Sequence, residues 1–140
     1  MPFLKFFPYH FSHSSFTIFP TQQTALHLAA RFDMSGSVVR VLVEAGASIN
    51  ALDDLKWSPL YHAAIENPAA VPVLLAANVV KVNLLSKSNW SPLFYAAFNN
   101  HSESVIAILK AGSYPHLGKS PLTDFLVSKD IKDLIKSLSN

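Results

Sequence analysis

A motif that recurs at a nearly constant interval constrains the fold of this chain more than any other feature. The sequence WSPLYHAA at positions 57–64 returns as WSPLFYAA at 90–97, and TALHLAA at 24–30 is an earlier copy of the same pattern. SPL at 120–122 begins a degraded fourth copy. A fixed interval in this range indicates a solenoid, in which each copy buries its apolar face only against its neighbours.

Each copy begins with residues that start a helix. Thr24, Ser58, Ser91 and Ser120 supply a hydroxyl that can accept a hydrogen bond from the free N–H groups of a first turn. Proline follows at 59, 92 and 121, where its missing N–H costs nothing. Alanine pairs at 29–30, 63–64 and 96–97 keep one side of this helix thin, so a neighbouring helix can approach closely.

A second helix is predicted after each alanine pair. The runs at 38–43, 71–75 and 105–109 carry apolar residues at three- and four-residue spacings and lack a wide polar face, which is typical of helices enclosed in a stack. Gly46 and Gly112 follow the first and third runs, where a left-handed residue ends a helix, and Asn78 takes that place in the second. Pro68 and Pro72 predict a late, short second helix in the second copy.

Together these features resemble the ankyrin-repeat family. The resemblance implies an all-α solenoid of stacked helix-turn-helix units with short β-hairpin tips. We expect an ankyrin-repeat domain at 21–140, with repeats at about 21–52, 53–85 and 86–114 and a C-terminal cap at 115–140. In the expected cap, Phe125 and Leu126 replace the alanine pair, and a helical stripe follows, made of Ile131, Leu134, Ile135 and Leu138.

The resemblance also assigns roles to single residues. His27 occupies the family's Thr-Pro-Leu-His position, where the imidazole bridges backbone groups of its own repeat and of the next. Tyr61 and Phe94 take the equivalent places and are expected not to copy the full hydrogen-bond pattern, so the later junctions would depend more on packing. Lys56 and Asn89 stand where the family prefers glycine in the hairpin. Repeat one lacks the acidic-glycine tip, with Phe19 and Gln22 at the matching positions.

Residues 1–20 differ from the rest because they are rich in aromatic residues and proline. Pro2, Pro8 and Pro20 prevent one continuous helix, and the apolar run is too interrupted for a signal peptide and too short for a membrane span. One interpretation is a tail that folds over the first repeat as an improvised cap. The other is insertion into a partner or a membrane surface, which the lack of a basic amphipathic helix disfavours.

Composition excludes several classes of function. The formal charge of +2 comes with no Lys/Arg cluster, which argues against nucleic-acid binding. The absence of cysteine excludes disulfides and zinc–thiolate sites and, with no convincing signal peptide, suits an intracellular protein of the cytoplasm or nucleus. No phosphate loop, nucleophile motif or His-Glu-x-x-His occurs, and His10 and His13 lack a third ligand. We expect no catalytic, cofactor-binding or metal-binding residue.

The sequence therefore predicts a monomeric, non-catalytic module that binds a partner protein. The resemblance places the contacts on the hairpin tips and the concave helix face. The alternative is a structural segment of a longer ankyrin array or multidomain protein, whose exposed ends neighbours would cover. Trp57 and Trp90 can be binding residues or can pack on the neighbouring hairpin. The expected partner-binding residues are Arg31, Phe32, Asp54, Leu55, Trp57, Ile65, Glu66, Lys87, Trp90, Phe98 and Asn99.

Overall fold

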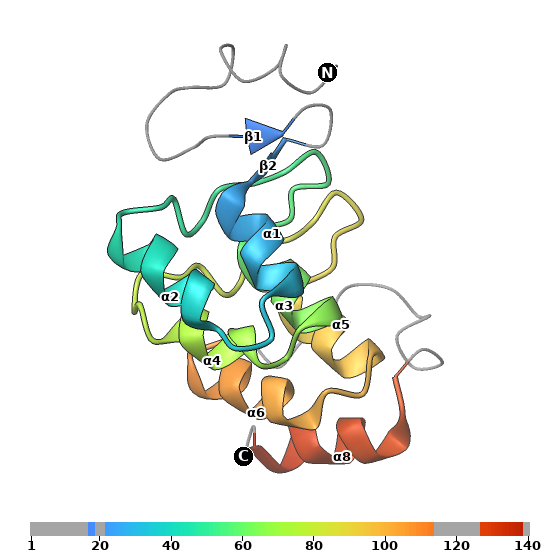
Figure 1. Ribbon diagram of the computed structural model, residues 1–140. Helices are drawn as coiled ribbons and strands as arrows, with labels where there is room; N and C mark the ends of the chain where they lie inside the picture. The colour runs from blue at the N-terminus through green and yellow to red at the C-terminus, as the bar shows by residue number, and fades with distance from the viewer. Residues whose placement is uncertain (1–16, 19–21, 114–126, 139–140) are drawn as a thin grey trace.

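The computed structural model describes residues 17–18, 22–113 and 127–138, and these residues form a helical stack (Figure 1). The helices come in three consecutive pairs, followed by one more helix. We refer to the pairs as repeats one, two and three. The elements are β1 (Thr17–Ile18), β2 (Gln23–Thr24), α1 (Ala25–Phe32), α2 (Ser37–Glu44), α3 (Pro59–Glu66), α4 (Ala70–Leu75), α5 (Pro92–Phe98), α6 (Ser102–Lys110) and α8 (Lys129–Leu138).

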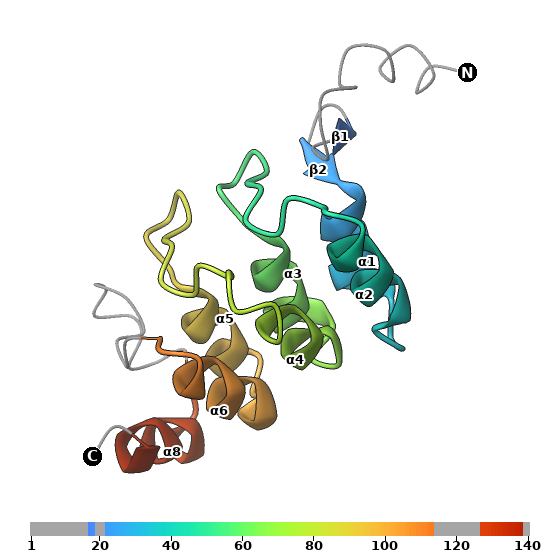
Figure 2. The same ribbon diagram turned by 90° about the vertical axis from the view of Figure 1, so that its left-hand side faces the viewer.

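The helices form two rows that run along the stack, and Figure 2 shows the stack from the side. In the inner row α1 contacts α3 and α3 contacts α5, while in the outer row α2, α4, α6 and α8 contact one another in that order. The paired alanines Ala63, Ala64, Ala96 and Ala97 are fully buried between the rows, as the sequence predicts. Small side chains thus let successive inner helices pack closely, and the chain is the predicted solenoid.

Two of the three predicted hydroxyl caps within the described residues are confirmed. The Thr24 hydroxyl accepts from the His27 N–H, and the Ser91 hydroxyl accepts from the Phe94 N–H at 3.2 Å. The prediction is wrong at Ser58, whose hydroxyl is buried without a hydrogen-bond partner. There the Tyr61 N–H donates to the Ser58 carbonyl at 3.0 Å, so the first turn closes through the backbone instead. Ser120 lies outside the described residues.

The outer helices end as predicted. Gly46 and Gly112 have φ of 91° and 99°, and Asn78 has φ of 59°, so all three are left-handed. Helix α4 has only six residues, which confirms the short helix. It is not late, however, because Ala70 starts α4 at the place in repeat two where Ser37 starts α2 in repeat one. The reason is that Pro72 falls in the first turn, where a missing N–H breaks no helical hydrogen bond.

The hairpin tips are tight turns closed by backbone hydrogen bonds. The Asp53 N–H donates to the Trp57 carbonyl at 3.0 Å, and the Ser86 N–H donates to the Trp90 carbonyl at 2.9 Å. Lys56 and Asn89 have φ of 59° and 64°, so each adopts the left-handed conformation of the glycine it replaces.

Strand pairing occurs at the first repeat, where the sequence does not predict it. β1 pairs antiparallel with β2, with Thr17 opposite Thr24 and Ile18 opposite Gln23. Gln22 also has a positive φ of 60°, because any residue at this turn position must reverse the chain as Lys56 and Asn89 do. Repeat one therefore begins with a hairpin although it lacks the acidic-glycine sequence.

The last helix matches the predicted apolar stripe in part. Ile131 and Ile135 of α8 are buried, Leu134 is half-buried, and α8 packs against α6. Leu138 is exposed, because it lies at the last turn of α8. Phe125 and Leu126 fall outside the described residues, so the role of 115–140 as a cap stays a prediction.

Gly36 provides a test of how tightly the outer helices pack. It has φ of 74°, and a Cβ added there would lie 2.8 Å from Cγ2 of Val73 on α4. We expect Gly36→Ala to destabilise the protein by about 2 kcal/mol or more, since the left-handed conformation alone costs about 1–2 kcal/mol. The measurement is the free energy of unfolding in urea.

The matched control is Gly46→Ala, which has φ of 91° but no atom within 4 Å of the new methyl group. Gly46→Ala should lose only the part of the free energy of unfolding that comes from the left-handed conformation. Equal losses in the two variants would show that α2 and α4 are not closely packed at Gly36.

Candidate functional site

The structure brings six of the expected binding residues into register along the inner helices. Arg31 and Phe32 end α1, Ile65 and Glu66 end α3, and the third pair sits at the end of α5. We call these six residues the inner-helix face: Arg31, Phe32, Ile65, Glu66, Phe98 and Asn99. Phe32 and Phe98 are 62% and 47% exposed, which is unusual for phenylalanine and leaves apolar surface at both ends of the row.

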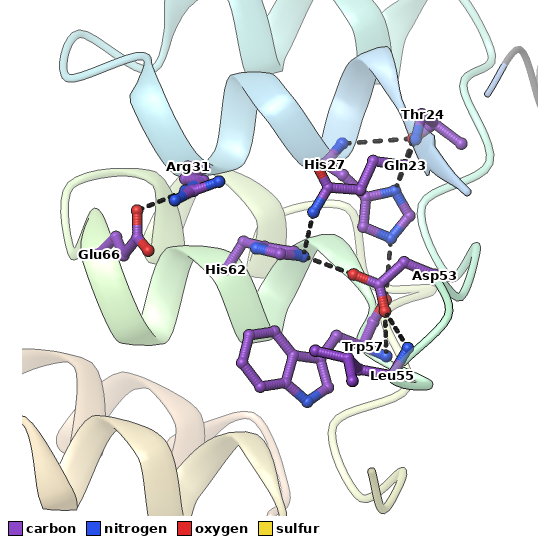
Figure 3. A network of polar contacts seen from close by, with 9 residues as sticks. All are labelled: Gln23, Thr24, His27, Arg31, Asp53, Leu55, Trp57, His62 and Glu66. Carbon is purple, nitrogen blue, oxygen red and sulfur yellow. Dashed lines mark hydrogen bonds and ion pairs between the residues drawn. The ribbon is translucent and has the colours of Figure 1, made fainter. Parts of the chain in front are cut away.

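Charge on the inner-helix face is largely neutralised within the chain. Arg31 Nε donates to Glu66 Oε2 at 2.6 Å and joins repeat one to repeat two (Figure 3). The Arg31 guanidinium also lies 4.7 Å from the centre of the Phe32 ring. Because both side chains of the ion pair are more than a third exposed, the pair adds at most about 1 kcal/mol of stability. Its larger effect is to fix the positions of Arg31 and Phe32.

The hairpin tips carry three more of the expected residues. Asp54, Leu55 and Lys87 are all exposed. The Lys87 N–H donates to the Leu55 carbonyl at 3.1 Å, so the second and third hairpins are joined by a backbone hydrogen bond. The tips therefore extend away from the inner-helix face as a connected edge.

The two tryptophans are half-buried and pack against other rings. Trp57 lies parallel to Tyr61 at 6.1 Å and contacts Tyr95 of the next repeat at 5.2 Å. Trp90 stacks on Phe94 with ring centres 3.9 Å apart. These contacts favour the structural interpretation of both residues, although each ring keeps part of its surface accessible.

His27 links repeats one and two through both of its ring nitrogens (Figure 3). Nδ1 lies 3.0 Å from the Thr24 nitrogen and Nε2 lies 2.9 Å from the Trp57 carbonyl oxygen. A carbonyl can only accept, so Nε2 carries the proton and Nδ1 accepts from the Thr24 N–H. Burial lowers the pKa of His27, and protonation at Nδ1 would place two donors face to face. The neutral ring therefore holds this junction, as the resemblance implies.

A buried carboxylate lies beside His27. Asp53 Oδ2 is 2.8 Å from His62 Nε2, while its Oδ1 accepts from the N–H groups of Leu55 and Trp57. Burial raises the pKa of Asp53, but the hydrogen bond from His62 and those from the backbone outweigh it and leave that pKa below its usual value. Asp53 is therefore ionised, and His62 donates to it. The carboxylate shapes the hairpin that presents Trp57.

The same three side chains could be considered a metal site. His27, Asp53 and His62 are buried, and each offers one ligand atom within 4.8 Å of the others. Both nitrogens of His27 are already hydrogen-bonded, and an ion would have to break its bond to the Trp57 carbonyl. The donor set thus fits a hydrogen-bonded junction better than a coordination site.

Tyr61 corrects one expectation about the second junction. Its hydroxyl donates to the Trp90 carbonyl at 2.8 Å and also contacts the Leu84 carbonyl. Trp90 is the counterpart of Trp57 in the next repeat, so the longer phenol reaches the carbonyl that is equivalent to the one His27 binds. Burial raises the pKa of Tyr61, so the hydroxyl keeps its proton. The cap bond at Ser58 is lost, but the bond between repeats is kept.

Further side chains bridge the repeats away from the hairpins. Asn67 Nδ2 donates to the Asp33 carbonyl at 2.8 Å, and the imidazole of His101 lies 2.9 Å from the Ala64 carbonyl oxygen. Asn50 binds both the Val79 carbonyl and the Lys81 N–H of the following repeat. The sequence analysis did not identify these contacts. Asn50 and Asn83 hold equivalent positions in consecutive repeats, and this recurrence could have indicated a shared role.

A comparison with known protein families identifies the class of protein that this geometry defines. The family model for ankyrin repeats matches residues 26–119 in three copies, so the chain belongs to the ankyrin-repeat family. Ankyrin repeats are in general non-catalytic modules for protein–protein interaction. A search of curated proteins finds no significant match. No helix among the described residues is long and apolar enough to cross a membrane.

The state of His27 predicts how stability depends on pH. The folded pKa of His27 is lowered, so below its ordinary value of about 6.5 the unfolded chain binds a proton that the folded chain resists. We expect the free energy of unfolding to fall between about pH 7.5 and about pH 5.5, by up to about 1.4 kcal/mol per pH unit for this one proton. The pKa of Asp53 is also lowered by folding, so Asp53 reduces the free energy of unfolding further, but only below the ordinary pKa of an aspartate.

The measurement is urea unfolding at several pH values for the wild type and His27→Gln. The variant should be less stable at pH 7.5 and should lose part of the slope, whereas His101→Gln keeps His27 and should keep the slope. A slope that is the same in wild type and His27→Gln would contradict this account of the junction.

Proposed function

We propose that this ankyrin-repeat protein binds an intracellular partner protein as a monomer, through the inner-helix face and the hairpin tips. The observation that carries the proposal is the exposure of Phe32 and Phe98 at the two ends of a row in which the Arg31–Glu66 ion pair joins repeats one and two. Large aromatic side chains flanked by polar groups are typical of the centre of an interface.

The geometry supports a partner that lies along the stack. The ends of α1, α3 and α5 are equivalent positions in consecutive repeats, so their side chains face the same way. The apolar residues are Phe32, Ile65 and Phe98, and they alternate with the Arg31–Glu66 ion pair and the Asn99 amide. Since this ion pair is internally neutralised, we expect recognition by apolar contact and hydrogen bonds more than by net charge.

Asp54, Leu55 and Lys87 extend the proposed contact to the hairpin tips. Their exposure and the backbone bond between the two tips support a stable second edge. Trp57 and Trp90 contribute the accessible parts of their rings, but their main contacts are internal. Replacing either tryptophan would therefore disturb packing as well as binding, and it is a poor first test.

The test uses exposed residues whose loss should leave the fold intact. The wild type is used to capture partners from a lysate of the source cell, and the captured protein is then titrated in purified form. We expect Phe32→Ala and Phe98→Ala each to weaken that binding about tenfold or more, as for hot-spot residues. Their melting temperatures should stay close to that of the wild type.

The matched control is Val79→Ala, which removes an equally exposed apolar side chain at 64% exposure from the turn after α4. It should bind with unchanged affinity. If Phe32→Ala and Phe98→Ala remain folded and bind as tightly as Val79→Ala, the inner-helix face is not the binding surface.

A further inference from the structure

The first outer helix exposes residues that later repeats bury. Val38 and Val41 of α2 are 51% and 62% exposed. Counted back from the left-handed residues Gly46, Asn78 and Gly112, the counterparts of Val38 are Ala70 and Ser104, at 0% and 2% exposure, and those of Val41 are Val73 and Ala107, which are both half-buried. Val73 lies beside Gly36 of the preceding repeat. The two valines therefore belong to a stacking surface that no helix among the described residues covers.

The inner helix of repeat one shows the same difference. Ala25 at the start of α1 is exposed, whereas Pro59 and Pro92 at the equivalent positions are buried. Leu28 is half-buried, whereas His62 in the equivalent position of repeat two is buried. We call this apolar surface the end face, made of Ala25, Leu28, Val38 and Val41.

We propose that residues 1–16 of this same chain cover the end face. The strand pair sets where this segment leaves the fold. β1 lies on the outer side of β2, at the end of the stack away from repeat two (Figure 2). Because Thr17 is opposite Thr24 in an antiparallel pair, the N-terminal end of β1 lies beside the start of α1 at Ala25, a member of the end face.

The composition of the segment suits an apolar surface. Five of its sixteen residues are phenylalanine, and Lys5 is its only acidic or basic side chain other than histidine. Sixteen residues span up to about 50 Å when extended, which exceeds the separation of about 10 Å between two packed helices. The segment can therefore reach from β1 across α1 to Val38 and Val41. Its prolines restrict it to an irregular cover and not to a further helix pair.

A tethered segment has an advantage over any other occupant. Attachment at β1 gives it an effective concentration in the millimolar range at the end face, which a second copy or a repeat from another protein reaches only at high concentration. Those two occupants are the alternatives that the experiment must separate.

The experiment uses paramagnetic labelling of the full chain, which contains no cysteine and so accepts a single label at a chosen position. Ala45→Cys places a nitroxide on the exposed C-cap of α2, one turn beyond Val41 and without replacing an end-face residue. We expect the amide signals of Phe6, Phe7 and Phe11 to lose at least half of their intensity relative to the reduced label.

The matched control is Ala111→Cys, the exposed C-cap of α6, which lies two repeats further along the stack. This label should leave the same amides unchanged. A mixed sample distinguishes the same chain from a second copy as the occupant. It contains protein that carries the nitroxide without isotope enrichment, together with isotopically enriched protein that carries no nitroxide. Loss of intensity that persists in the mixed sample would assign the end face to a second copy, and full intensity with both labels would leave the face without this segment; either result overturns the proposal.

A stability measurement provides an independent check. A valine that is 62% exposed should tolerate serine, whereas a valine covered by the segment should not. We expect Val41→Ser to lower the melting temperature by several degrees in the wild-type background and by much less when Phe6 and Phe7 are also serine. Equal shifts in the two backgrounds would contradict the proposed contact.

Discussion

The structure depends on one recurring interaction, in which a side chain in the first turn of α1 and of α3 donates to the same carbonyl of the next hairpin. His27 does this to Trp57, and Tyr61 does it to Trp90. A repeat of this size cannot bury its own apolar face, so its stability comes from the interface with its neighbours. These bonds fix the height and rotation at which that interface forms, because a shifted repeat would leave the side-chain donor without its acceptor. The carbonyls themselves also accept from the Asp53 and Ser86 N–H groups within their own hairpins.

The proposed binding surface follows from this alignment. Once the repeats are in register, the ends of α1, α3 and α5 present Phe32, Ile65 and Phe98 in one row, and Arg31 reaches Glu66 of the next repeat. The buried side chains of His27, Asp53 and His62 are hydrogen-bonded within the junction. In the proposed function, the polar interior serves to hold that surface in place.

The fold was predictable from the sequence because its signals are local. Proline, alanine pairs and left-handed glycine or asparagine act within one helix turn, so the helices and their ends follow from the repeat alone. The polar contacts between repeats were less predictable because they depend on side-chain reach across a junction. The phenol of Tyr61 is longer than the imidazole it replaces, and it restores a bond that the sequence comparison suggested was lost. His62 lies near His27 only after folding, because the two residues belong to different repeats. The binding residues remain a prediction, since exposure along a row does not identify a partner.

The most direct test of this account is native-state hydrogen exchange on Tyr61→Phe and its matched control Tyr95→Phe. Tyr95 lies beside Tyr61, with ring centres 5.7 Å apart, but its hydroxyl makes no hydrogen bond among the residues the structure describes. We expect Tyr61→Phe to lower the free energy of opening for the α5 and α6 amides by about 0.5–1.5 kcal/mol, since the hydroxyl that bonds the Trp90 carbonyl of the next hairpin is lost. Tyr95→Phe should leave those values unchanged. Equal protection of α5 and α6 in the two variants would show that this hydrogen bond does not hold the repeats together.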